Sequence, residues 1–140
     1  MEGSEQPALG LDTSVVLRLL TGQPEGQAAA ALRRLEAEAG AGRPALVCDM
    51  VVAEAYYALH YHYGAPKREA ARSLLDFLVS GLVRPDPVGV ALVALRSSLS
   101  SSPKPGFVDR LIHAQYARKG AALLTFEHAA TRLPNVLVLR

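Results

Sequence analysis

Short apolar runs alternate with longer helical patterns along this chain. Between the runs, apolar residues recur at the three- and four-residue spacing that is typical of amphipathic helices. An alternation of strand and helix patterns indicates βα units, which form a parallel sheet with helices on its faces. The pattern therefore predicts an α/β fold, with strands at 8–11, 45–48, 82–84, 121–125 and 135–139.

The predicted helices are bounded by residues that favour helix ends. Pro66 suits a first helical turn, and Gly64 and Gly120 stand where helices end. Asp49 precedes a helix and is expected to be its N-cap, because its carboxylate can accept hydrogen bonds from the free amide groups of the first turn. Helices are expected at about 13–20, 25–39, 50–63, 66–80 and 107–119, and others are expected to open at Pro87 and Glu127.

The sequence contains neither an internal repeat nor a domain boundary. We therefore expect a single domain over residues 1–140, in which the polar residues 1–7 form a flexible N-terminus. This terminus does not have the pattern of a signal peptide, and no stretch approaches the roughly 20 apolar residues of a membrane span. Cys48, the single cysteine, follows an apolar run and is expected to be a buried thiol at a strand end. We expect a cytoplasmic protein that does not act at a membrane.

Composition limits the kinds of partner that the chain can bind through bulk charge. Half of the 140 residues are hydrophobic and 20% are charged, which is typical of an ordinary globular core. The formal net charge is only +2, so the molecule as a whole is not a polycation. Any contact with nucleic acid must therefore come from a local patch of basic side chains.

Four carboxylates stand where a predicted strand ends or a predicted helix begins. Asp12 and Glu127 follow apolar runs, Asp109 lies in the first turn of a helix, and Glu54 lies near the start of another. Acids in such positions can converge at the carboxyl ends of parallel strands, where open α/β sheets bind their ligands. A cluster of carboxylates without cysteine or a well-placed histidine favours hard cations, so the predicted occupant is Mg²⁺ or Mn²⁺.

Each of these acids also has a purely structural interpretation. Asp12, Asp109 and Glu127 could stabilise helix starts through capping or through the helix dipole. Glu54 is harder to explain in this way, because it shares a helix face with apolar residues and a partly buried carboxylate needs a partner. The two histidines of the 50–63 helix are two residues apart and diverge, so they do not form a second metal site.

Four segments in this order resemble the motifs of the PIN-domain family, and within it the VapC-type toxins of toxin–antitoxin pairs. They are 11–16, 51–54, 107–114 and 120–126, and the resemblance covers nearly the whole chain. The resemblance implies a single PIN-like domain, with a parallel sheet of about five strands flanked by helices.

The resemblance also implies a metal-dependent endoribonuclease that hydrolyses RNA phosphodiester bonds with Mg²⁺ or Mn²⁺. Asp12, Glu54 and Asp109 match the acids of the family's metal site. Glu127 stands where the family often has an aspartate, and its extra methylene favours contact with the metal through water. A toxin of this kind has a cognate antitoxin as its partner, and a homodimer is expected. Two positions match polar residues that line the site in relatives, Ser14 and Thr125.

Three basic residues are candidates for contact with RNA phosphates, although each could be ordinary solvated surface charge. They are Arg18, Lys104 and Arg110. Two other functions stay open at this stage. One is an RNA-processing PIN nuclease without a toxin role, and the other is an inactive PIN-like module that binds RNA or a protein.

Overall fold

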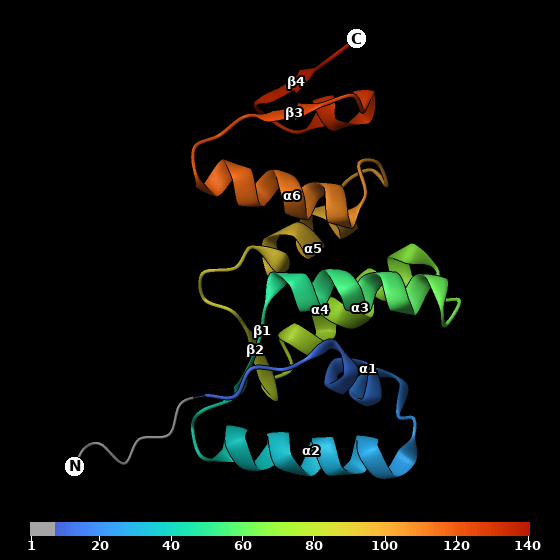
Figure 1. Cartoon of the computed structure of the whole chain (residues 1–140), viewed down its shortest axis with the longest axis vertical. Coiled ribbons are helices and arrows are strands. Elements are labelled where there is room, and N and C mark those ends of the chain that lie inside the picture. The colour runs from blue at the N-terminus through green and yellow to red at the C-terminus, as the bar shows by residue number, and fades with distance from the viewer. Residues whose placement is uncertain (1–7) are drawn as a thin grey trace, which may run out of the picture.

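Six α-helices, one short 3-10 helix and four short strands make up residues 8–140, the part of the chain that the computed structural model describes (Figure 1). The N-terminus expected to be flexible, 1–7, lies outside this part. The helices are α1 (Thr13–Thr21), α2 (Glu25–Gly40), α3 (Asp49–Tyr61), α4 (Lys67–Leu78), α5 (Ala91–Ser100), α6 (Phe107–Arg118) and η2 (His128–Arg132). The strands are β1 (Ala45–Val47), β2 (Val83–Pro85), β3 (Leu123–Thr125) and β4 (Val136–Val138).

The strands form two separate two-stranded sheets, so the predicted single sheet of about five strands is wrong. β1 pairs in parallel with β2, and β3 pairs in parallel with β4. The expected first strand, 8–11, is reduced to one parallel bridge between Gly10 and Leu46. In Figure 1, α5 and α6 lie between the two sheets, which explains the division. The predicted α/β class and the parallel pairing are confirmed.

The hydrophobic core lies among α1, α3, α4, α5 and the start of α6, around the β1–β2 sheet. Complete burial of one such apolar side chain is worth about 1.5–3 kcal/mol. After α6, Ala130 is the one residue of the described chain that is buried. The β3–β4 sheet therefore adds little to the core. The largest fully buried side chains are Val16, Val47, Val52, Leu74, Leu95 and Phe107.

The helix ends agree with the predicted ones to within a few residues, with one larger difference. α1 ends at Thr21 and is capped by Gly22, whose φ of 71° lies in the left-handed region that favours glycine. α5 begins at Ala91 rather than at Pro87. Cys48 is exposed, so its predicted burial is wrong. The reason is that β1 ends at Val47 and Cys48 is the N-cap residue of α3 rather than part of the strand. Across the described residues, no helix has both the length and the apolar character needed to span a membrane.

Asp49 caps a different helix from the predicted one, because it is itself the first residue of α3. Its carboxylate accepts hydrogen bonds from the backbone N–H groups of Val90 and Ala91, at the start of α5, at 2.9–3.0 Å. It also accepts one from Gln115 Nε2 of α6 at 3.1 Å. A Cβ atom on Gly89 would lie 2.5 Å from Asp49 Oδ1, so a larger residue there would displace the Asp49 carboxylate. One carboxylate thus joins the end of β1 to α5 and α6.

Candidate active site

Asp12 and Glu54 are linked through Thr13 at the starts of α1 and α3. The Asp12 carboxylate caps α1, since it accepts from the backbone N–H of Thr13 at 2.8 Å. Its other oxygen accepts from Ser14 Oγ at 3.2 Å. Thr13 Oγ1 donates to Glu54 Oε1 at 2.6 Å. The predicted capping role of Asp12 is confirmed, and these contacts also orient both carboxylates. The role of Thr13 in orienting Glu54 was not predicted from the sequence, although its position next to Asp12 could have suggested it.

Glu54 is exposed, so the prediction of a partly buried carboxylate is wrong. Of its apolar neighbours on α3, Met50 and Tyr57 are exposed and Val51 is buried, and Tyr61, one turn beyond Tyr57, is exposed as well. The rings of Tyr57 and Tyr61 stack with their centroids 5.9 Å apart. Glu54 therefore lies at the border of the buried face of α3, where Thr13 of α1 donates to its carboxylate and the side formed by Met50, Tyr57 and Tyr61 is open to solvent.

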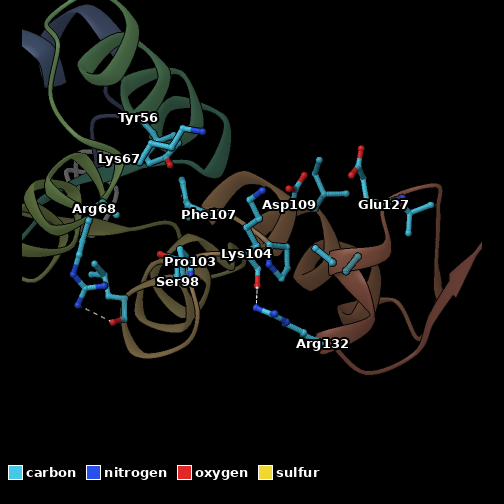
Figure 2. Close-up of a pocket in the computed structure, with 18 of the residues that line it drawn as sticks. Tyr56, Lys67, Arg68, Ser98, Pro103, Lys104, Phe107, Asp109, Glu127 and Arg132 are labelled. Carbon is cyan, nitrogen blue, oxygen red and sulfur yellow. Dashed lines mark hydrogen bonds between the residues drawn. The ribbon is translucent and has the colours of Figure 1, made fainter.

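Asp109 and Glu127 line one cleft of about 1020 Å³ (Figure 2). Asp109 lies in the first turn of α6, and Glu127 lies between β3 and η2. The Glu127 side chain makes no capping hydrogen bond to η2, which removes the support for a purely structural role. The backbone N–H of Glu127 donates to Thr125 Oγ1 at 3.0 Å, so Thr125 fixes the turn after β3. Both carboxylates line the cleft, where a cation or its hydration water could reach them.

The four acids form two pairs that lie on separate halves of the fold. Residues 9–11, which precede Asp12, lie beside β1, whereas β3, which precedes Glu127, belongs to the other sheet. Among the residues that the structure describes, no three His, Cys, Asp or Glu side chains form a group that could hold a metal ion. One pair is Asp12 with Glu54, and the other is Asp109 with Glu127.

Basic side chains from three elements share the cleft with Asp109 and Glu127. Figure 2 displays them on its two walls, on α4 on one side and on the loop before α6 and η2 on the other. Because they come from separate parts of the chain, no sequence pattern grouped them. A cleft that combines cations with two acids can hold a polyanion next to a bound metal ion. The basic residues are Lys67, Arg68, Lys104 and Arg132, of which Lys104 was predicted from the sequence.

Arg110 is buried, so its predicted contact with RNA is wrong. Arg110 is only 4% exposed. Its guanidinium group donates to the carbonyl oxygen of Pro105 at 2.7 Å, to Ser97 Oγ at 2.9 Å and to the carbonyl oxygen of Ser102 at 3.0 Å. Desolvation lowers the pKa of Arg110, and the nearby charge of Arg132 lowers it further. Arg110 holds the loop between α5 and α6 and thereby sets the start of the helix that carries the acid of the cleft.

The other two predicted RNA contacts differ in their surroundings. Arg18 Nε donates to Gln27 Oε1 at 2.8 Å, so this guanidinium links α1 to α2. Lys104 is exposed and lines the cleft, and its backbone carbonyl accepts a hydrogen bond from Arg132 at 3.1 Å. Lys104 is therefore the better placed of the two to contact a phosphate near Asp109.

Tyr56 forms part of the wall of the cleft near Asp109. Desolvation raises the pKa of its phenol, and the charges of Tyr57, Tyr61 and Asp109 raise it further. The phenol therefore stays protonated at neutral pH and adds no negative charge beside the acid. Its ring packs edge-on against Phe107, with the centroids 5.0 Å apart.

These features define a small α/β protein with carboxylates at strand ends and helix starts and with a cleft of mixed charge. A family model described as the PIN domain matches residues 10–136. The chain belongs to the PIN-domain family, whose members are generally nucleases that act on RNA. The match spans all four acids and confirms the family predicted from the sequence. Comparison with curated proteins and with solved structures gives no match.

Proposed function

We propose that this chain is a metal-dependent endoribonuclease that hydrolyses RNA phosphodiester bonds, and that it is the toxin of a type II toxin–antitoxin pair. The observation that carries the proposal is the cleft, in which Asp109 and Glu127 lie between walls that bear four basic side chains. PIN-domain nucleases usually use divalent metals. An RNA strand is a polyanion, so such a cleft would attract it while the acids retain a cation.

The donor atoms of the proposed site are carboxylate oxygens, which suit Mg²⁺ or Mn²⁺. As the family resemblance implies, Asp12, Glu54 and Asp109 would hold the ion and Glu127 would contact it through water, which requires the two pairs of acids to be brought together. When bound, the metal supplies an activated water and stabilises charge on the scissile phosphate and the leaving oxygen. Since the carboxylates would be occupied in holding the metal, none of them serves as the attacking nucleophile.

The chain's other residues would position the carboxylates and the RNA. Thr13 and Ser14 donate hydrogen bonds to Glu54 and Asp12, which limits the rotation of these two acids. Thr125 holds the backbone of Glu127. Removing a residue that orients a metal-binding group typically costs about 10–100-fold in affinity or activity. We expect Thr13→Val, which removes the hydroxyl and keeps the shape, to lower the cleavage rate within that range.

Cleavage of a panel of structured RNAs with Mg²⁺, Mn²⁺ or excess EDTA tests the activity. We expect cleavage with either metal and none with EDTA. Asp12→Asn and Asp109→Asn should abolish cleavage and leave the fold intact, because both acids are exposed. Asp76→Asn is the matched control, since Asp76 is an exposed acid of α4 outside the cleft. Cleavage in excess EDTA would exclude the metal mechanism, and cleavage at the wild-type rate by either Asn variant would make that acid a helix cap only.

Glu127→Ala tests the contact through water. Because Mg²⁺ retains several waters, a carboxylate that is set back by one methylene serves more readily through water than by direct ligation. We expect Glu127→Ala to weaken Mn²⁺ binding and cleavage less than Asp12→Ala or Asp109→Ala. Calorimetric titration with Mn²⁺ measures the affinities. An equal or larger loss in Glu127→Ala would make it a direct ligand.

The basic residues of the cleft are proposed to bind RNA phosphates. Lys67→Gln or Lys104→Gln should weaken RNA binding for all sequences alike and lower the slope of log K against log salt by about 0.7–0.9, as the loss of one phosphate contact predicts. Lys119→Gln is the control, because Lys119 is exposed at the end of α6 and does not line the cleft. If the control and the cleft variants have the same salt slope, RNA binds elsewhere.

The toxin role adds a cognate antitoxin as a partner. The exposed apolar surface formed by Met50, Tyr57 and Tyr61 on α3 supports a protein partner, since such patches usually mark interfaces. The product of a small open reading frame next to the gene is the antitoxin to test by co-expression. Tyr61→Glu should prevent its co-purification, whereas Val79→Glu, an exposed position on another surface, should not. If no neighbouring product binds, the chain is an RNA-processing nuclease without a toxin role.

A further inference from the structure

Four strand edges have no partner among the residues that the structure describes, those of residues 9–11, β2, β3 and β4, and two of them precede acids of the proposed site. β3 pairs with β4 alone. In the other sheet, the Leu11 N–H donates to the Leu46 carbonyl, and the Leu9 carbonyl accepts from the Leu46 N–H. The N–H and C=O groups of Gly10, which lies between them, therefore face away from β1. A Cβ atom on Gly10 would meet nothing within 4 Å, which means that the space at this edge is open. Open edges of this kind are templates for pairing with another strand.

The β3–β4 sheet also leaves one apolar face uncovered. Leu124 and Leu137 are neighbours across the two strands and are 59% and 62% exposed. Phe126 and Leu139, two residues further along each strand, are 74% and 45% exposed. Parallel sheets are usually covered on both faces, because their strands are apolar on both sides. The free edge of β3 and this face therefore form one surface that lacks a partner.

The β3–β4 sheet is fixed at a distance from the Gly10 edge of its own chain. Arg110 ties down the loop before α6 with three hydrogen bonds. Arg132 of η2 donates to the carbonyl of Lys104 in the same loop at 3.1 Å, and His113 Nε2 of α6 bonds to the carbonyl of Pro134 at 2.7 Å. Figure 1 shows α5 and α6 between the two sheets. The sheet would have to break these contacts to reach its own Gly10, whereas a second molecule can meet that edge without breaking any.

We propose that two copies of this chain exchange their β3–β4 sheets, so that β3 of each copy pairs in parallel with residues 9–11 of the other. A twofold axis makes the exchange reciprocal, and neither edge is then left open. The resulting sheet runs β2, β1, residues 9–11, β3 and β4, the last two from the second copy. The helices around the β1–β2 sheet of the second copy cover the exposed leucines. Five parallel strands, the number expected from the sequence, are thus assembled from two chains.

The exchange also completes the proposed nuclease site, and in this respect it rests on the proposed function. Asp12 directly follows residues 9–11, and Glu127 follows Thr125, the last residue of β3, with one residue between them. Neighbouring parallel strands end at the same edge of a sheet, which is where α/β folds bind ligands. The pair Asp12 and Glu54 of one copy therefore meets the pair Asp109 and Glu127 of the other. Each dimer holds two such sites.

Sedimentation velocity at micromolar concentrations tests the interface without reference to activity. We expect a dimer for the wild-type chain and a dissociation constant raised at least about tenfold by Leu124→Lys or by Leu137→Lys, because a charge would be buried at the exchanged sheet. Both side chains are exposed within one copy, so the variants should keep its fold, which circular dichroism verifies. Val93→Lys is the matched control, at 64% exposure on α5. A wild-type monomer, or a dimer that neither leucine variant weakens, would overturn the proposal.

Mixing two inactive variants tests whether each site uses both copies. Asp12→Asn and Asp109→Asn chains that carry different affinity tags are co-expressed and purified through both tags, which isolates mixed dimers. In a mixed dimer, one site carries both substitutions and the other carries neither. We expect about half of the wild-type cleavage rate per dimer, since one of its two sites is intact. No recovery would mean that each chain completes its own site, which overturns the exchange.

The two experiments also separate this proposal from the proposed function. If the wild-type chain cleaves no RNA with any metal, the nuclease proposal fails, and sedimentation of the leucine variants still decides whether the sheets are exchanged. If the wild-type chain cleaves RNA as a monomer, the nuclease proposal stands and the exchange is refuted.

Discussion

Replacing Arg110 by methionine tests whether a buried guanidinium group organises the loop before α6. Methionine keeps an unbranched apolar stem of similar length but has no donor. The substitution would leave three acceptors without their present partner, namely the carbonyls of Pro105 and Ser102 and the hydroxyl of Ser97. These groups lie at the junction between α5 and α6, so the change affects the helix pair that separates the two sheets.

The three acceptors differ in how much the loss would cost. The Pro105 carbonyl is buried, and leaving a buried acceptor unsatisfied costs about 1–3 kcal/mol. The contacts to Ser97 and Ser102 are half-buried, so water can replace the donor and the cost is about 0.5–1 kcal/mol for each. Relief of the desolvation of Arg110 offsets part of the total. We expect a loss of about 2–4 kcal/mol in the free energy of unfolding, or roughly 6–20 °C in melting temperature for a domain of this size.

Urea unfolding followed by circular dichroism measures the loss. Arg96→Met is the control, since Arg96 is an exposed residue of α5 and should change the stability by less than about 0.5 kcal/mol. Arg110→Lys should fall between the two, because lysine retains the charge but lacks the planar fork that reaches three acceptors. If Arg110→Met is no less stable than the control, the three hydrogen bonds do not hold the loop and the reasoning is wrong.

Three other substitutions test contacts elsewhere in the fold. Asp49→Ala should lower the free energy of unfolding by about 1–2 kcal/mol, as the loss of a helix cap does, while Asp76→Ala at an exposed site of α4 should not; urea unfolding compares them. Gly89→Ala should cost about 1–3 kcal/mol in the same assay, because its Cβ would overlap Asp49 Oδ1, and no loss would mean that the carboxylate moves freely. Burial alone would raise the pKa of Glu38, but hydrogen bonds from two arginines lower it below its usual 4.5. The interaction of ionised Glu38 with the two arginines therefore stabilises the fold fully above the unfolded pKa of Glu38. This stabilisation is lost as the pH falls through its folded pKa. Glu38→Gln should destabilise the protein near pH 7 and match the wild type once the pH is below the folded pKa of Glu38, and a difference that persists in acid would exclude ionisation as its cause.

Local structure followed from the sequence because its determinants are local. Helical spacing, Gly22 after α1 and the apolar runs at β1 to β4 each depend on residues that are neighbours along the chain. The arrangement of the strands depends on contacts between distant segments. Arg110 and Asp49, the two side chains that fix α5 and α6 in place, join residues that no periodic pattern connects. The sequence therefore predicted parallel strands but could not predict their division into two sheets.

The candidate site was predictable in its residue types and not in its geometry. Carboxylates next to strand ends can be read from the sequence, and Asp109 and Glu127 do share a cleft. Exposure is harder to predict, because it depends on which element covers a face. Glu54 and Cys48 are both exposed although their apolar neighbours in the sequence suggested burial, and Arg110 is buried although it is an arginine in a first helical turn.

The contacts of Asp49 also bear on how the native protein opens. One carboxylate receives hydrogen bonds from the start of α5 and from Gln115 of α6, so these helices cannot separate from the end of β1 without leaving it unpaired. Segments that are tied in this way tend to open together as one cooperative unit. Within one copy, the strands β3 and β4 have no fully buried residue, so in the monomer they should open independently. Native-state amide hydrogen exchange of the monomer should therefore be slow and uniform through α3, α5 and α6 and become fast beyond Gly120.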